Sequence, residues 1–119
     1  MTILEAIGLI DTLRPNLRTN AEKCAWLYEL DAKTALEVFH STVPEPYDYS
    51  QDSARTLLIE SPYDDLYVLY LITKLDFFDG EYARYSNDAL VFNSEYLDFA
   101  KYWRRSHKPA RKKIRAVGS

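Results

Sequence analysis

Residues 82–103 read YARYSNDALVFNSEYLDFAKYW, and the spacing of the large apolar side chains in this stretch decides the fold. Aromatic residues and one alanine recur at alternating steps of three and four. Such a repeat places its members along one face of an α-helix, because an ideal helix drifts only about 20° per seven residues from it. The stretch therefore predicts a long helix, over about residues 81–105, whose seam packs against other helices. The members of the seam are Tyr82, Tyr85, Ala89, Phe92, Tyr96, Phe99 and Trp103.

The start of the chain predicts a helix over about residues 2–13. Thr2 and Glu5 have the spacing of a capping box, in which each of the two side chains binds a free backbone amide of the first turn. Pro15 ends the helix, because the residue before a proline is pushed out of the α-helical region. Ile3, Ile7 and Ile10 recur at helical spacing, and further leucines widen this apolar stripe. These leucines are Leu4, Leu9 and Leu13.

A second capping box, made of Thr19 and Glu22, opens a predicted helix over about residues 20–40. Cys24 lies on the apolar face of this helix, and we expect it to be a buried structural thiol. It is the single cysteine of the chain, so no intrachain disulfide can form. This fits a reducing, intracellular place of synthesis.

The helix expected over about residues 62–79 is apolar nearly all round, which predicts a central place in the core. Ser61 has the character of its N-cap and Pro62 that of its first residue, while Gly80 suits its end. Prolines and acids mark residues 41–60 before it as a long loop. Within that loop, the apolar run at residues 56–59 allows either a stub of strand or an extended segment held against the core.

Together these elements predict an all-α, four-helix bundle-like domain over residues 1–106, followed by a mobile basic tail at 107–119. Residues 1–106 hold ten Lys and Arg against eighteen Asp and Glu, a net charge of −8. Residues 107–119 hold five Lys and Arg and no acid. No apolar run approaches the ~20 residues of a membrane span and no signal segment opens the chain, so we expect a soluble protein, cytoplasmic when made.

The sequence contains few residues in the patterns that catalytic, metal or phosphate-binding sites require. His40 and His107 are far apart and near no other ligand type, and three glycines leave little chance of a phosphate-binding loop. The aromatic stripe of residues 82–103 suits a ligand cage or a nucleic-acid stacking platform, but a helix-packing core is the better interpretation on an acidic body. We therefore expect no catalytic, cofactor or metal site, and no enzyme. Two carboxylate pairs, Asp64 with Asp65 and Asp76 with Asp79, are expected to be solvated helix ends.

Candidate partner-binding residues come from two features. The chain has ten tyrosines, and tyrosine suits interfaces because its ring buries well while its hydroxyl needs a partner. The basic end of the chain is either a solvated tail or an arm that pairs with an acidic protein surface, a neighbouring copy or nucleic-acid phosphate. The candidates are Tyr47, Tyr49, Arg104, Arg105, Lys108, Arg111, Lys112, Lys113 and Arg115.

Several runs of the chain resemble small proteins encoded in prophages and tailed bacteriophages of Gram-positive bacteria. The resemblance is carried by residues 61–67 (SPYDDLY), 75–87 (LDFFDGEYARYSN) and 92–96 (FNSEY). The openings at residues 2–7 (TILEAI) and 14–16 (RPN) are similar too. Such proteins lie among head-morphogenesis genes, and their size and helical character resemble head–tail connector (adaptor) proteins.

The resemblance implies a virion structural protein that forms a homo-oligomeric ring between portal and tail or neck proteins. It implies assembly in the bacterial host cytoplasm and a final place in the virion neck, without a membrane. DNA would pass through the ring without sequence-specific binding. The alternative is a small nucleic-acid-binding regulatory protein that uses its basic C-terminal tail.

Overall fold

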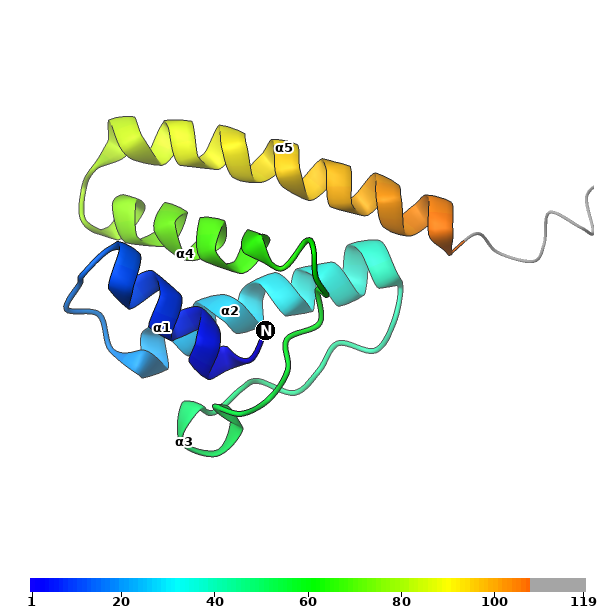
Figure 1. The fold of residues 1–119 in the computed structure, drawn as a ribbon, viewed down its shortest axis with the longest axis horizontal. Helices are drawn as coiled ribbons and strands as arrows, with labels where there is room; N and C mark the ends of the chain where they lie inside the picture. Colours follow the sequence, from blue (N-terminus) through cyan, green and yellow to red (C-terminus); the bar gives the residue numbers. More distant parts are fainter. Residues whose placement is uncertain (108–119) are drawn as a thin grey trace, which may run out of the picture.

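Four long helices carry the fold in the computed structural model, which describes residues 1–107 (Figure 1). They are α1 (Ile3–Leu13), α2 (Asn20–Thr34), α4 (Asp65–Phe78) and α5 (Tyr82–Ser106). A π-helical turn, η1 (Ala35–Phe39), continues α2, and a short helix, α3 (Tyr49–Asp52), interrupts the long loop. The all-α class is confirmed. The predicted mobile tail lies, from residue 108 on, outside the described residues.

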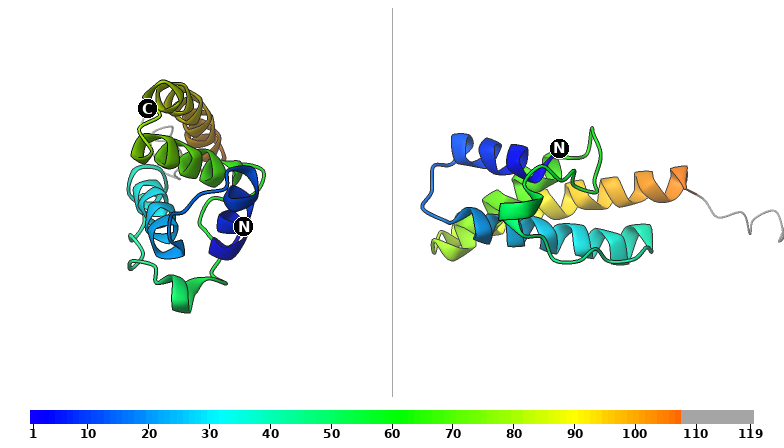
Figure 2. Two further views of the ribbon diagram at one scale, coloured as in Figure 1. Left: turned by 90° about the vertical axis from the view of Figure 1, so that its left-hand side faces the viewer. Right: turned by 90° about the horizontal axis from the view of Figure 1, so that it is seen from below.

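Helix α4 lies at the centre of the arrangement and contacts α1, α2 and α5 (Figure 1). α5 runs back along one side of α4, and α1 and α2 cover its other side (Figure 2). The prediction that this apolar helix is central is therefore confirmed. A helix with neighbours on most of its circumference needs apolar residues on most of its circumference, which explains its composition.

Both predicted capping boxes are present. The Thr2 hydroxyl accepts from the Glu5 amide at 3.1 Å, and the Glu5 carboxylate accepts from the Thr2 amide at 2.8 Å. Thr19 and Glu22 repeat the exchange at 3.0 and 3.1 Å. Each box satisfies backbone donors that the first turn of a helix leaves free, so the two starts are fixed by local sequence alone.

The predicted start of α4 is wrong by three residues. The helix begins at Asp65, and residues 61–64 form a turn in which the Tyr63 amide donates to the Glu60 carbonyl at 3.0 Å. The turn carries the Tyr63 ring against Phe99 and Tyr102 of α5, with ring centroids 5.4 and 5.0 Å apart. Burial of this ring outweighs the N-cap preference of a serine. The end of α4 is as predicted, because Gly80 adopts the positive φ of 77° that a side chain disfavours.

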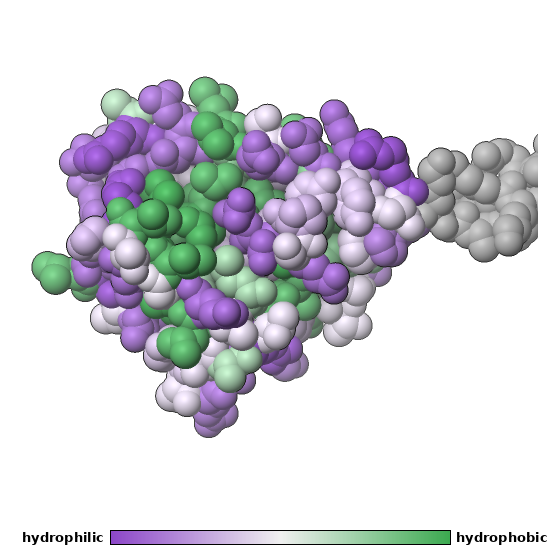
Figure 3. All heavy atoms as spheres, in the orientation of Figure 1, coloured by the Kyte–Doolittle hydropathy of each residue, from purple (hydrophilic) through white to green (hydrophobic). Residues whose placement is uncertain are grey.

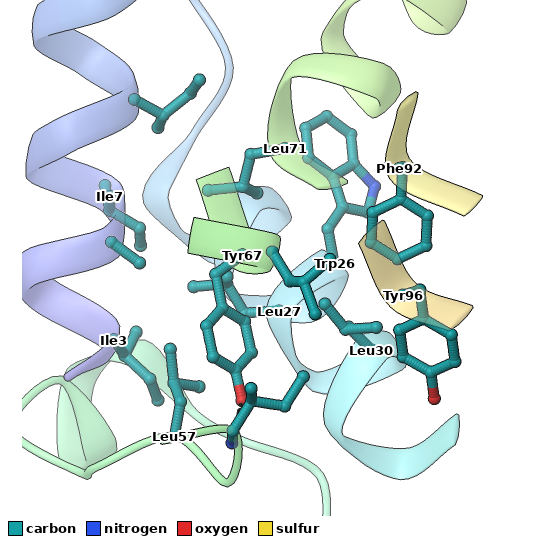
Figure 4. Packing of buried hydrophobic residues seen from close by; sticks show 14 of the residues in the cluster. Ile3, Ile7, Trp26, Leu27, Leu30, Leu57, Tyr67, Leu71, Phe92 and Tyr96 are labelled. Carbon is teal, nitrogen blue, oxygen red and sulfur yellow. Dashed lines mark hydrogen bonds between the residues drawn. The ribbon is translucent and has the colours of Figure 1, made fainter. Parts of the chain in front are cut away.

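The core seam of α5 is confirmed from its middle onward. Phe92, Tyr96 and Phe99 are buried, and Tyr96 stacks on Phe92 at 5.5 Å. Figure 4 shows both rings facing α2, where Trp26 and Leu30 project toward them. The stripe is thus a helix-packing core. Its predicted first member is the exception, because Tyr82 lies beyond the end of α4 and is 63% exposed.

The long loop is pinned to the core by residues 56–59, so the second of the two open interpretations is correct. Thr56 forms an isolated β-bridge with Thr2, and the Leu57 amide donates to the Met1 carbonyl at 2.9 Å. Leu57 and Ile59 are buried, with Leu57 close to Ile3 of α1 (Figure 4). This extended segment closes the end of the core between α1 and α4.

A buried carboxylate, Asp31 of α2, holds the loop in place. It accepts hydrogen bonds from the Tyr67 hydroxyl at 2.5 Å, the Tyr47 hydroxyl at 2.7 Å and the Leu58 amide at 3.2 Å. The Tyr67 hydroxyl in turn accepts from the Ile59 amide at 2.6 Å. We call these five residues the Asp31 hub. It connects α2 and α4 to both ends of the loop.

Burial raises the pKa of Asp31, and the hydrogen bonds from Tyr67, Tyr47 and the Leu58 amide oppose that rise. Burial also raises the pKa of both tyrosines, with the Asp31 carboxylate adding to the shift. Both hydroxyls therefore stay protonated and serve as donors. A buried acid is tolerated while it keeps its hydrogen bonds. If it loses a donor, its buried oxygen lacks a hydrogen-bond partner and the folded state is destabilised.

Tyr67→Phe tests the hub. The substitution keeps the ring but removes the donor to Asp31 and the acceptor of the Ile59 amide, so two buried groups lose a partner. We expect the free energy of unfolding to fall by about 2–3 kcal/mol in urea titration. Tyr82→Phe, at an exposed ring, is the matched control and should change it by less than about 0.5 kcal/mol. Equal effects of the two substitutions would contradict the role given to the hub.

Candidate functional site

The structure describes four of the nine predicted partner-binding residues. Tyr47 is buried in the Asp31 hub, with Arg55 over its ring at 4.8 Å, so it has little surface to offer. Tyr49 is half-buried against the core at the start of α3. Arg104 and Arg105 are exposed on the last turn of α5. The other five, Lys108, Arg111, Lys112, Lys113 and Arg115, lie outside the described residues.

The two carboxylate pairs do not behave alike. Asp65 is exposed in the first turn of α4, and Asp79 is exposed and pairs with Arg18 at 2.9 Å. The expectation that Asp76 is solvated is wrong, because its side chain is 1% exposed. Asp76 faces Arg14, the residue that ends α1, and the two form an ion pair. Nothing in the spacing of α4 signals this, since the partner comes from a distant helix.

A second acid, Asp88 of α5, reaches the same ion pair. Burial and the nearby charge of Asp76 raise the pKa of Asp88 to about 6. Within the described residues, Asp76 Oδ2 and Asp88 Oδ2 are buried oxygens that accept no hydrogen bond. One proton shared between them would satisfy both. Arg14, Asp76 and Asp88 therefore join α1, α4 and α5 through an arrangement that is best satisfied below pH 6.

A more extended feature lies beside this cluster, where α1, α4 and α5 meet. The three helices enclose an open groove of about 570 Å³. Its floor comes from α4 and its two walls from α1 and α5. We call it the apolar groove, and its lining residues are Leu9, Leu13, Asp65, Val68, Leu69, Ile72, Val91 and Glu95.

The walls of the apolar groove are exposed hydrophobic side chains. Leu9 and Leu13 of α1 are 45% and 59% exposed, and Val91 of α5 is 49% exposed. Figure 3 shows apolar side chains gathered on this face, over α1, α4 and α5. Single exposed leucines are ordinary, but a contiguous apolar surface in a concave site is typical of a place where another molecule binds.

Among the described residues, the charged side chains that line the apolar groove are acids. Asp65 and Glu95 stand at its edge. Asp98 follows Val91 by seven residues, so helical spacing puts it on the same side of α5, and it is exposed. The surface thus combines an apolar floor with a negative rim. It has the chemistry of a site for a partner that is apolar and basic.

α1 carries more apolar residues than it buries. Of its wide apolar stripe, Ile3, Ile7 and Ile10 are buried, together with Ala6. Leu4, Leu9 and Leu13, which widen the predicted apolar stripe, are all exposed. α1 touches α2 and α4 along a narrow stripe only. A helix with more apolar residues than its neighbours can cover is the pattern that could have indicated a binding surface.

Other kinds of site find little support among the described residues. Residues 1–107 contain no group of three or more His, Cys, Asp and Glu arranged to hold a metal ion. Cys24 is buried as predicted, and burial raises the pKa of its thiol, which disfavours the nucleophilic thiolate. In the same part of the chain, no helix has the length and apolar character that crossing a bilayer requires.

Comparisons of the chain with protein-family models, curated proteins and solved structures found no match.

Asp88→Asn tests the shared carboxyl pair. A folded-state pKa of about 6, above the ordinary 3.8, means that the folded protein holds this proton more tightly than the unfolded chain. Stability therefore falls as pH rises from about 4 to 6, and repulsion persists above. The variant removes the repulsion, so we expect it to be about 1 kcal/mol more stable than wild type at pH 7.5, with the difference shrinking toward pH 4. Thermal unfolding at both pH values measures this.

Asp98→Asn is the matched control for that experiment, because Asp98 is an exposed carboxylate on the same helix. It should leave the pH dependence of stability unchanged. A pH dependence that is the same in Asp88→Asn as in wild type would rule out the pairing.

Proposed function

We propose that this protein is an assembly protein that works by binding other protein chains, in the manner of a phage head–tail connector. The apolar groove carries the proposal. It exposes leucine and valine side chains on three helices that a buried core fixes relative to one another. A binding surface on rigid helices loses little conformational entropy when a partner docks, which favours stable assembly.

The form of assembly that we propose is a homo-oligomeric ring that contacts portal and tail or neck proteins. A ring needs a heterologous interface, in which one face of a subunit meets a different face of the next. The groove supplies one such face, and the remainder of the helical body is free to supply the other. The resemblance of residues 61–67 and 75–87 to prophage proteins supports this choice among assembly proteins.

The charge of the helical body fits a ring through which DNA passes. Residues 1–106 carry a net charge of −8, and an acidic lumen repels phosphate. DNA would then slide through without sequence-specific contacts. A nucleic-acid-binding regulator would instead need a basic surface on its folded part, and among the described residues Arg104 and Arg105 form only a small one.

Native mass spectrometry and electron microscopy of the full chain test this proposal. We expect oligomers of the protein alone, closing into rings, and complexes when a portal protein is added. A strict monomer at high protein concentration that also ignores portal and neck proteins would overturn it. DNA binding that weakens steeply with salt would favour the regulator instead.

The groove itself is tested by the double variant Leu13→Ser, Val91→Ser. Both side chains are largely exposed, so folding should be preserved, while association should weaken by about tenfold or more because the apolar anchors are lost. Leu36→Ser is the matched control, since Leu36 is 62% exposed on η1, away from the groove. Analytical ultracentrifugation compares the three proteins. Equal association of all three would show that the groove is not the interface.

A further inference from the structure

We propose that the apolar groove of one copy binds residues 107–119 of a second copy. This inference rests on the proposed function and names what fills the site. The groove has an apolar floor, and the charged side chains that line it in residues 1–107 are Asp65 and Glu95. Asp98 adds a third acid on the same side of α5. Its complement is a segment that offers both apolar and basic side chains.

The chain contains one segment of that composition. Residues 107–119 carry five Lys and Arg and no acid, with Ile114 and Val117 among them. Ile114 is flanked by Lys112, Lys113 and Arg115, so an apolar side chain can enter the groove while basic neighbours meet its rim. The rest of the chain carries a net charge of −8 and has no comparable stretch. Oppositely charged surfaces of this kind favour the right partner and speed its encounter.

The direction of α5 favours a second copy over the same chain. α5 continues to Ser106, beyond the start of α4 and away from the groove (Figure 1). At 1.5 Å per residue, Ser106 lies about 22 Å along the helix from the level of Val91. Ile114 is eight residues further on, and eight extended residues span at most about 28 Å. To place Ile114 at the level of Val91 in its own copy, the tail would therefore have to reverse direction, cross the width of α5 and run almost fully extended.

A second copy has no such restriction, because its tail can approach the groove from outside. Each copy then donates one tail and accepts one, so the contact is heterologous and closes into a ring where the rotation between copies allows. The partner copy contributes the residues that complete the site. The exposed leucines of α1 become buried only in the assembly.

Charge reversal tests the pairing in the full chain. The groove variant is Glu95→Lys with Asp98→Lys, which leaves Asp65 in place because an acid stabilises the first turn of α4. The tail variant is Lys112→Glu, Lys113→Glu and Arg115→Glu. Each alone brings like charges together, and we expect its self-association to weaken by about tenfold or more in ultracentrifugation. Glu45→Lys, in the exposed loop, makes the same kind of charge change and should leave association intact.

Mixing the two variants gives the decisive result. In a mixture, basic tails meet acidic grooves and acidic tails meet basic grooves, but only between different chains. We expect assembly to return, with both masses in each oligomer by native mass spectrometry. If each variant is monomeric and the mixture stays so, the tail binds elsewhere or to its own groove, and the inference is overturned.

The failure of this inference differs from that of the proposed function. Wild type that assembles, with both variants assembling equally well, overturns the tail–groove contact and leaves the assembly function standing. Wild type that is monomeric and ignores portal proteins overturns both. Should the groove variant fail to fold by circular dichroism, a synthetic peptide of residues 107–119 is titrated into the tail variant, whose groove is intact. Saturable binding supports the contact, and no binding overturns it.

Discussion

The hydrogen bonds of Asp31 are the constraint on which the rest of the structure depends. One buried carboxylate collects donors from Tyr47, Tyr67 and the Leu58 amide, which lie on three separate parts of the chain. A buried acid is tolerated only while such donors are present. The hub therefore fixes the long loop, and with it the position of α4 relative to α2. The loop, which looks like a connector in the sequence, is part of the core.

Sequence alone predicts the elements whose signals are local. The capping boxes at Thr2 and Thr19 fix two helix starts, and the alternating aromatic steps give α5. The start of α4 could not be found in this way, because packing of the Tyr63 ring against α5 overrides the local preference of Ser61 for a cap. The Asp31 hub likewise could not be predicted from local sequence. An aspartate on a helix looks solvated until its partners, 16 and 36 residues away, are known.

From the sequence, the candidate site could be predicted only as an excess of apolar residues on α1. The apolar residues of α1 form a stripe wider than one packed face, and that much is visible in Leu4, Leu9 and Leu13. Deciding which of them are buried requires the positions of α2 and α4, which no local pattern provides. The acidic rim of the groove likewise depends on how the helices pack. Glu95 and Asp65 become neighbours of one groove only because α4 and α5 pack side by side.

The groove and the hub are two sides of one helix. Tyr67 of α4 points into the core and binds Asp31, while the adjacent Val68 and Leu69 face outward and form the floor of the groove. Any rotation of α4 that improved one face would displace the other, because successive residues on a helix are about 100° apart. The network that fixes Tyr67 thus also sets the shape of the binding surface. A buried polar cluster serves in this way to hold an exposed apolar site in one conformation.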